Sequence, residues 1–377
     1  MPISPLRSPS PPEKLDWIRL IRSENVGPIT FRRLLQRFGS AKQALAALPD
    51  MARRGGQAAA IRICSERDAR REVDKLTAVG GRMVFLGDTD YPPLLAHIED
   101  APPLLSIIGH EHLVERPAIG IVGARNASVA GQRLAKRIAT DLGAAGLIVV
   151  SGLARGIDTA AHHGTLATGT IAVMAGGIDS VYPRQNESLY GEIAQHGVIV
   201  SEMPIGTVAR ARDFPRRNRL VSGLGMGVVV IEAGARSGSL ITARMALEQG
   251  RDVFAVPGAP SDPRSSGGND LIRQGAILTE SANDVLGVVN GLERSSLEEP
   301  QPIDFIHAIP ISVDAAEVEK ARSVIEESLS SAPVTVDEII RNCQFSPSVV
   351  SVVLLDMELA GRLERHPGHQ VSLIQGN

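Results

Sequence analysis

The hydrophobic positions in the middle of the chain form short apolar runs that are separated by segments with helical spacing. The run Val228–Ile231 is rich in β-branched residues, which is typical of a strand buried on both faces. A Gly/Ser loop follows, after which Leu240 and Leu247 recur on one helix face, and Ser239 stands where an N-cap belongs. The sequence therefore predicts a strand, a small-residue loop and a helix N-terminus, an arrangement that suits an anion such as phosphate.

Similar apolar runs alternate with helical patterns from Ala118 onwards, which predicts parallel βαβ units and an α/β fold. Several of these strands end in Gly, Ser or Arg, and open α/β sheets bind ligands at the carboxyl ends of their strands. The segment Gly120–Arg125 lacks the G-x-G-x-x-G spacing, and no acidic residue ends the second strand, so we expect neither NAD nor another cofactor. We predict strands at 118–123, 147–151, 170–175, 198–201, 227–232, 252–256 and 276–279, preceded by a short strand at 83–86.

The N-terminal region predicts a proline-rich disordered tail at 1–12 and a small helical domain at 13–80. Gly39 is placed to stop one helix, and Ser40 to cap the next. The helix before Gly39 carries Arg32, Arg33 and Arg37, and the unit resembles a helix-hairpin-helix or SAM-like module. These arginines either contact DNA backbone or form a solvated face, and the sequence leaves both interpretations open.

The C-terminal region predicts a linker at 291–317 and a winged helix-turn-helix at 318–377, after a main domain at 81–290. The third helix of the winged helix, at 347–360, contains no Lys or Arg but carries Asp356 and Glu358. A helix that reads bases in the major groove needs the opposite charge. We therefore expect this helix to contact protein or to have a structural role.

Charge is distributed unevenly along the 377 residues, although the net charge is only −3. Residues 1–80 hold 15 Lys/Arg and 8 Asp/Glu, whereas residues 303–377 hold 5 and 11, which favours anion contact by the front half. The segment 210–219 has five arginines against Asp213 alone, and this excess predicts a polymeric anion. Cys64 and Cys343 suggest neither a disulfide nor a zinc site, which fits a reducing cytoplasm, and we expect no signal peptide or membrane span.

Six motifs of the middle domain occur together and in one order, and together they resemble the DprA/Smf family of DNA-processing proteins. The resemblance implies an extended Rossmann-like, doubly wound, mostly parallel sheet between the helical domain and the winged helix. It also implies sequence-independent binding of single-stranded DNA, homodimers, and loading of the RecA recombinase during natural transformation. The motifs are SGLARGID (151–158), AGGIDSVYPRQN (175–186), SEMPIG (201–206), FPRRNRLVSGL (214–224), IEAGARSGSLITA (231–243) and FAVPG (254–258).

The candidate DNA-binding residues lie in these motifs and in the loop after the first parallel strand. Arg125 corresponds to the family's Gly-Ser/Ala-Arg phosphate contact, and the arginines that flank Asn218 are the strongest phosphate candidates from the residues themselves. Phe214 either stacks on bases or anchors a basic turn in the core, and Arg155 either contacts phosphate or braces its loop. The predicted set is Gly123, Arg125, Ser151, Gly152, Arg155, Gly176, Phe214, Arg216, Arg217, Asn218, Arg219, Ser237, Gly238 and Ser239.

Other residues of the same motifs predict supporting roles. We expect Asp158 to cap the following helix, Glu232 to fix a loop, and His162 to be a polar residue without a metal. An enzymatic alternative is a nucleotide phosphoribohydrolase with Glu202 or Glu232 as general base, although the PGGxGTxxE signature of that class is missing. A third alternative is an adaptor that contacts no nucleic acid, which leaves the basic segment unexplained. We predict no catalytic residue.

Overall fold

The computed structural model describes residues 7–57, 59–295, 315–366 and 368–374, and its described residues form two compact units. The sheet unit contains residues 71–295. The helical unit joins the helices before residue 71 to the described residues after 314. The predicted linker falls mostly outside the described residues, as do residues 1–6 of the predicted tail.

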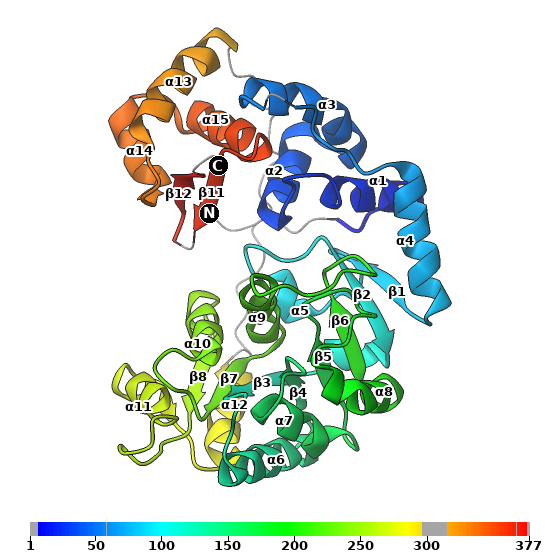
Figure 1. Ribbon diagram of the computed structural model, residues 1–377, viewed down its shortest axis with the longest axis vertical. Helices are drawn as coiled ribbons and strands as arrows, with labels where there is room; N and C mark the ends of the chain where they lie inside the picture. Colours follow the sequence, from blue (N-terminus) through cyan, green and yellow to red (C-terminus); the bar gives the residue numbers. More distant parts are fainter. Residues whose placement is uncertain (1–6, 58, 296–314, 367, 375–377) are drawn as a thin grey trace. The chain divides into compact units, whose positions relative to one another are not determined.

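A nine-stranded sheet forms the centre of the sheet unit (Figure 1). Its strands follow the order β1-β2-β6-β5-β4-β3-β7-β8-β9, and pairing is parallel from β6 to β9, whereas β1 and β2 are antiparallel. This confirms the predicted mostly parallel α/β sheet. The strands are β1 (Arg82–Phe85), β2 (Leu104–Gly109), β3 (Ala118–Gly123), β4 (Ile148–Ser151), β5 (Thr170–Val173), β6 (Val198–Ser201), β7 (Gly227–Ile231), β8 (Asp252–Ala255) and β9 (Ile277–Leu278).

The strand order reverses between β3 and β7. The chain moves outward from β3 through β4 and β5 to β6, and then returns to place β7 on the other side of β3. Loops that leave β3 and β7 therefore diverge, which opens a crevice at the carboxyl edge of the sheet.

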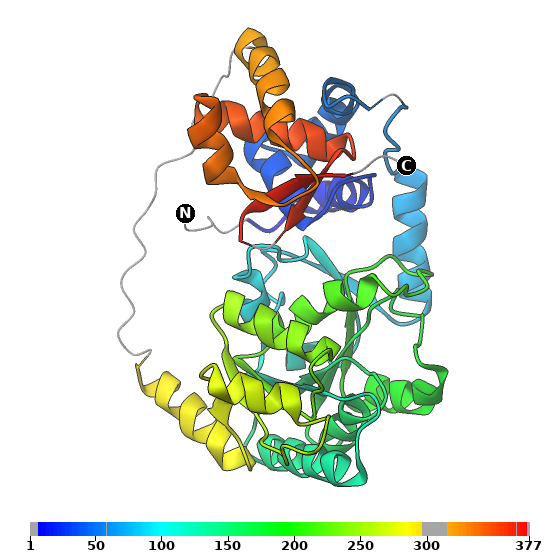
Figure 2. The ribbon, with the colours of Figure 1, turned by 60° about the vertical axis from the view of Figure 1, so that its left-hand side comes forward.

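Helices cover both faces of this sheet, as in a doubly wound fold (Figure 2). One face carries α6 (Val129–Ala144), α7 (Ile157–Thr165), α8 (Glu187–His196) and α12 (Ala282–Ser295), and the other carries α9 (Asp213–Leu224) and α10 (Gly238–Glu248). Residues such as Ile119, Ile121, Val149 and Ile231 are fully buried because the parallel strands are covered on both sides. Shorter helices are α5 (Pro93–Ala96) and α11 (Ser266–Arg273).

The helical unit begins with α1 (Pro11–Ile21), α2 (Pro28–Phe38) and α3 (Ala41–Arg54), and α4 (Glu66–Ala78) continues into the sheet unit. Gly39 ends α2 with a positive φ of 73°, and the Ser40 side chain accepts from the Gln43 N–H, so both predicted caps are confirmed. The winged helix follows with α13 (Ala315–Ser328), β10 (Val334–Thr335), α14 (Val336–Cys343), α15 (Pro347–Leu359), β11 (Leu363–His366) and β12 (Gln370–Leu373).

Three local predictions were wrong. The helix α1 begins inside the predicted tail, at Pro11, because Ser10 and Glu13 form a capping box. The predicted basic turn is the first part of α9, since Pro215 lies in a first turn, where its missing N–H has no cost. The helix after β7 is capped by Ser237, whose side chain accepts from the Ser239 N–H, so the cap lies two residues before the predicted one.

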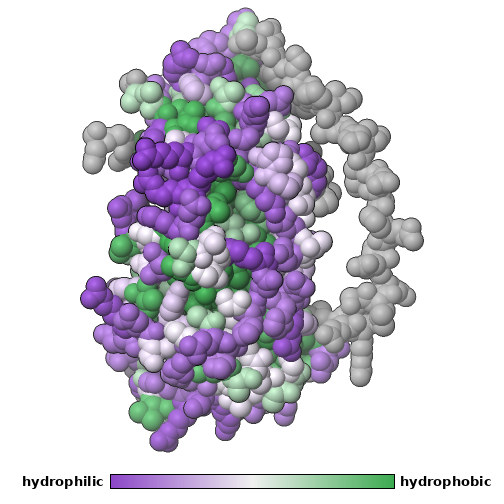
Figure 3. All heavy atoms as spheres, turned by 90° about the vertical axis from the view of Figure 1, so that its right-hand side faces the viewer, coloured by the Kyte–Doolittle hydropathy of each residue, from purple (hydrophilic) through white to green (hydrophobic). Residues whose placement is uncertain are grey.

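Hydrophilic residues cover much of the face drawn in Figure 3, with hydrophobic ones interspersed among them. Among the described residues, no helix has the length and apolar character needed to cross a membrane.

Candidate nucleic-acid interface

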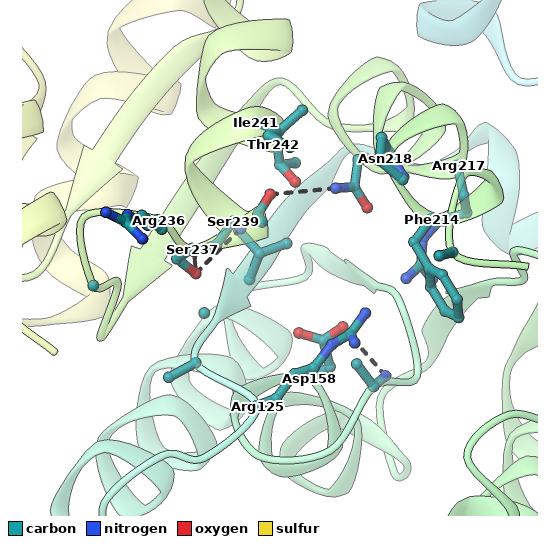
Figure 4. Close-up of a pocket in the computed structure, with 18 of the residues that line it drawn as sticks. Arg125, Asp158, Phe214, Arg217, Asn218, Arg236, Ser237, Ser239, Ile241 and Thr242 are labelled. Carbon is teal, nitrogen blue, oxygen red and sulfur yellow. Dashed lines mark hydrogen bonds between the residues drawn. The ribbon is translucent and has the colours of Figure 1, made fainter.

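A cavity of about 1070 Å³ lies at the carboxyl edge of the sheet, where the loops after β3 and β7 diverge (Figure 4). Its walls come from the loop that begins at Gly123, from the first turns of α9 and from residues 234–242. A second cavity of about 420 Å³ adjoins it and shares Arg125, Ala154, Tyr182 and Phe214 with it. We call the two cavities together the groove.

Arg125 and two aromatic rings stand where the two cavities meet. The Arg125 guanidinium lies 5.0 Å from the centroid of the Phe214 ring, and the Tyr182 ring lies 5.4 Å from it on a tilted plane. Tyr182 is 54% exposed, and Phe214 is partly exposed. The structure therefore places Phe214 at the groove and leaves ring surface for a base to stack on.

The groove carries cationic side chains without ion pairs. Arg125, Arg155, Arg184 and Arg236 line it, and none of them forms a salt bridge within the described residues. All four are exposed. The lining carboxylate is Asp158, which is buried, so the accessible charge in the groove is positive and suits a phosphate backbone.

Small residues of the loop after β7 form the opposite wall of the groove. Ser237, Gly238 and Ser239 line the larger cavity at the N-terminus of α10, and the Asn218 side chain donates to the Gly238 carbonyl oxygen over 3.3 Å. The helix N-terminus presents partial positive charge to the cavity. Asn218 therefore holds the loop in place.

Arg217 reaches the groove only at its edge, because its side chain is 5% exposed. Its guanidinium donates to the carbonyl oxygens of Gly152, which follows β4, and of Val173, which ends β5. Burial lowers the pKa of Arg217 to about 10, although Asp158 acts in the opposite direction, and the side chain remains charged at neutral pH. Arg217 thus caps strand ends and places positive charge under the groove, rather than extending to a phosphate.

Arg219 lies away from the groove, contrary to its predicted role as a phosphate contact. It is 6% exposed and pairs with Glu202 at 2.5 Å and Asp100 at 2.9 Å. Burial alone would lower the pKa of Arg219, but the two carboxylates outweigh it and raise that pKa above its ordinary value. Arg216 is more exposed, pairs with Glu202 at 3.1 Å and also lies outside the groove lining. Both arginines have structural partners.

Two further predicted residues, Ser151 and Gly176, also lie outside the groove lining. The Ser151 hydroxyl is fully buried and donates to the Ile121 carbonyl oxygen, whereas the Gly176 carbonyl accepts from Ser201. Gly152 does line the smaller cavity, and a Cβ added there would lie 2.4 Å from the Arg217 guanidinium, which would have to shift.

Two acids organise the loops of the groove, the buried Asp158 and the partly exposed Glu232. Asp158 accepts from the backbone N–H groups of Gly152 and Ala154, so it fixes the loop before α7 instead of capping the helix, whose N-cap is Gly156. Burial raises the pKa of Asp158, and Arg217 opposes that shift. Glu232 accepts from the Ser128 backbone N–H over 2.8 Å and from its hydroxyl, which confirms its role in fixing a loop.

His162 is fully buried in α7 and lies 2.8 Å from the Thr170 hydroxyl through its Nδ1. Burial lowers the pKa of His162 to about 3, so the ring is neutral. No group of His, Cys, Asp and Glu side chains in the described part of the chain is arranged to hold a metal ion. This geometry gives His162 a structural role.

Sequence reasoning did not assign the aromatic and cationic groove residues Tyr182, Arg184 and Arg236 to the site. Each of them lies in one of the six motifs, so the sequence indicated the correct segments but not these particular side chains. Tyr182 had no stacking partner in sequence, because Phe214 comes from another strand-end segment.

Three family models cover most of the chain. The model described as "DNA recombination-mediator protein A" matches residues 82–290, "DprA-like N-terminal HHH domain" matches 11–74, and "DprA winged helix domain" matches 310–369. The chain belongs to the DprA/Smf family. The resemblance seen in the motifs is thereby confirmed.

Relatives in this family align over long stretches. "Protein Smf" of Synechocystis is 31% identical over 94% of this chain and 98% of its own length, and "DNA processing protein DprA" of Streptococcus pneumoniae is 44% identical over 53% and 71%. The X-ray structure of DprA from S. pneumoniae superposes with a TM-score of 0.60 at 33% identity and covers 75% of this chain and 98% of that one. A DprA structure from Helicobacter pylori, described for its single-stranded DNA binding mode, superposes with a TM-score of 0.51 at 27% identity and covers 57% of this chain and 96% of that one.

Proposed function

We propose that the chain binds single-stranded DNA in the groove, without sequence preference, and hands it to the RecA recombinase during DNA uptake in natural transformation. The observation that carries this proposal is the meeting of Arg125 with the Phe214 and Tyr182 rings between two cationic cavities. Arginine binds phosphate, and the ring surfaces accept any base, because every base has a π face. The H. pylori relative's single-stranded DNA binding mode supports the same ligand.

Binding without catalysis is part of the proposal. The candidate general base Glu202 is held by Arg216 and Arg219, and Glu232 is held by Ser128. A general base must have a free lone pair within reach of a substrate proton. Neither carboxylate lines the groove, and this supports a binding protein over a nucleotide hydrolase.

Delivery to a recombinase, homodimer formation and a cytoplasmic location complete the proposal. They rest on family membership and on the description of the central family model as a recombination mediator. Sedimentation at micromolar concentration tests the homodimer. Delivery can be tested by measuring ATP hydrolysis by RecA on single-stranded DNA that is coated with a single-strand-binding protein. If the chain delivers DNA to RecA, the hydrolysis should begin sooner when the chain is added.

A gel-shift competition tests the binding itself. A labelled oligonucleotide should be displaced by unlabelled single strands of any sequence and poorly by duplex of equal length, since a flexible strand can enter the groove and expose its bases. Arg125→Ala should flatten the plot of log affinity against log salt by about 0.7, the slope for one phosphate of a single strand. Equal competition by duplex, or an unchanged slope in a folded Arg125→Ala variant, would refute the assignment.

A further inference from the structure

The third helix of the winged helix, α15, is apolar on more than one face. Val349, Val353 and Met357 pack into the winged-helix core, whereas Leu355 and Leu359 are buried but lie outside that core. A helix that is apolar nearly all round is covered on two sides. The second cover is the N-terminal helical bundle, because α15 lies against α3 within the helical unit (Figure 1).

Polar contacts attach the C-terminal end of α15 to the bundle. The Asn25 side chain donates to the Leu359 carbonyl oxygen over 2.9 Å, and the Thr30 hydroxyl donates to Glu358 over 2.6 Å. At the end of α3, a Cβ added to Gly55 would lie 2.0 Å from the Asp356 carbonyl oxygen. The two backbones therefore approach more closely than any residue except glycine permits.

Asp356 is the charge at the centre of this contact. Its side chain is fully buried, with Arg54 at 3.4 Å and Arg37 at 4.0 Å from the bundle, and Arg322 of α13 at 3.1 Å. The pairing matches the opposite charges of the two ends of the chain, with 15 Lys/Arg against 8 Asp/Glu in residues 1–80 and 5 against 11 in residues 303–377. An acidic helix end thus occupies the place that an anion would take on the bundle.

We propose that α15 covers a second polyanion-binding face, formed by Arg37 and Arg54 on the N-terminal bundle, and that release of the winged helix exposes this face to DNA. The helix that reads bases in other winged helices here packs against the N-terminal bundle of the same chain. This face lies outside the groove, and DNA would bind to it only as a polyanion.

The contact is built so that it can open. The winged helix has a hydrophobic core of its own, and in the bundle Trp17 meets Phe31 edge to face at 4.9 Å. Asp356 keeps Arg322 as a partner after separation. In the closed state, Asp356 Oδ1 has no hydrogen-bond partner among the described residues, and the Arg37 and Arg54 side chains remain 32% and 46% exposed. The contact is therefore polar, incomplete and accessible to a competing anion.

Gly55→Ala in the full chain tests the proposal without removing a charge. Gly55 has φ −66° and ψ −2°, which alanine adopts freely, so α3 keeps its own geometry while the methyl group excludes α15. Hydrogen exchange should increase in residues 355–361. Arg37 and Arg54, released from Asp356, should steepen the salt dependence of single-stranded DNA binding by about 1.4. The variant should therefore lose about sevenfold more affinity than the parent between 50 and 200 mM salt.

The matched control is Gly27→Ala, because a Cβ at Gly27 meets nothing within 4 Å. Adding Arg37→Gln and Arg54→Gln to Gly55→Ala should restore the parental slope, and Asp356→Asn should reproduce the steeper slope if Gly55→Ala proves unstable. Unchanged exchange in Gly55→Ala overturns the docking, and increased exchange with an unchanged slope overturns the polyanion face. A failure of the proposed groove function would be seen separately, because the Arg125→Ala variant would then keep the salt dependence of the parent.

Discussion

The substitution Arg219→Ala tests whether this arginine of α9 stabilises the fold or contacts DNA. Both groups lie in one basic segment, and the sequence assigned Arg217 and Arg219 to phosphate. In the structure, Arg219 is enclosed between Glu202 and Asp100, with its side chain 7% exposed, while Arg125 is exposed at the groove. We expect Arg219→Ala to reduce stability and leave the salt dependence of DNA binding unchanged.

The size of the stability loss depends on which charges lose their partners when Arg219 is removed. Removing one member of a buried ion pair costs about 3–5 kcal/mol, because the remaining charge stays desolvated. Glu202 keeps Arg216 at 3.1 Å, and Asp100 is 36% exposed, so water and a second arginine compensate part of the loss. The expected cost is therefore near the lower limit, about 3 kcal/mol, which for a unit of this size lowers Tm by roughly 6–12 °C.

Thermal melting and salt titration of the same preparations provide the test. Arg125→Ala is the matched variant, for which we expect a Tm close to that of the parent and a slope reduced by about 0.7. Arg219→Ala should be assayed well below its Tm, where it should keep the parental slope. A stable Arg219→Ala variant with a flattened slope would show that Arg219 contacts phosphate after all and that its ion pairs contribute little.

Three further predictions concern single residues. Phe214→Ala should weaken binding by roughly 1–3 kcal/mol per stacked base with an unchanged salt slope, and a flattened slope would contradict a stacking role. Burial holds the pKa of His162 near 3, against 6.5 when unfolded, so acidification from pH 6.5 should cost ~1.4 kcal/mol per pH unit. Urea unfolding at pH 7.5 and 5 should show about 2 kcal/mol less pH dependence in His162→Asn, and an equal dependence refutes this. Gly123→Ala should lower Tm because its Cβ would lie 1.9 Å from the Ile231 carbonyl oxygen, and an unchanged Tm would contradict that close approach.

The sheet could be predicted from sequence because its signals are local. Fully apolar runs such as Val228–Ile231 require cover on both faces, and the alternation with helices implies parallel pairing. The strand β2, at Leu104–Gly109, was missed because it follows a proline-rich segment and pairs antiparallel with β6, far along the chain. Such pairing leaves no periodic trace in a single sequence.

The sequence predicted where the candidate site lies in the fold, but it predicted only some of the residues that line it. Strand-end reasoning located the loops at Gly123 and Ser237, yet it could not separate Arg125 from Arg219, because exposure depends on carboxylates from other elements. Asp100 lies more than a hundred residues before Arg219 in the chain, and no local pattern connects the two. No local pattern indicated the contact of Asp356 with the bundle either, although the acidic residues of α15 favoured a protein contact or a structural role over base reading.

The reversal of strand order between β3 and β7 affects how fast DNA can be captured. Because the two loops diverge as a consequence of topology, and Asp158 and Glu232 hold the backbone on either side, the groove is open before any ligand arrives. Association then requires no rearrangement of the protein, so diffusion and charge should set its rate. Ionic strength should accordingly alter how quickly a strand binds more than how long it stays, and stopped-flow traces recorded across a salt series would resolve the two.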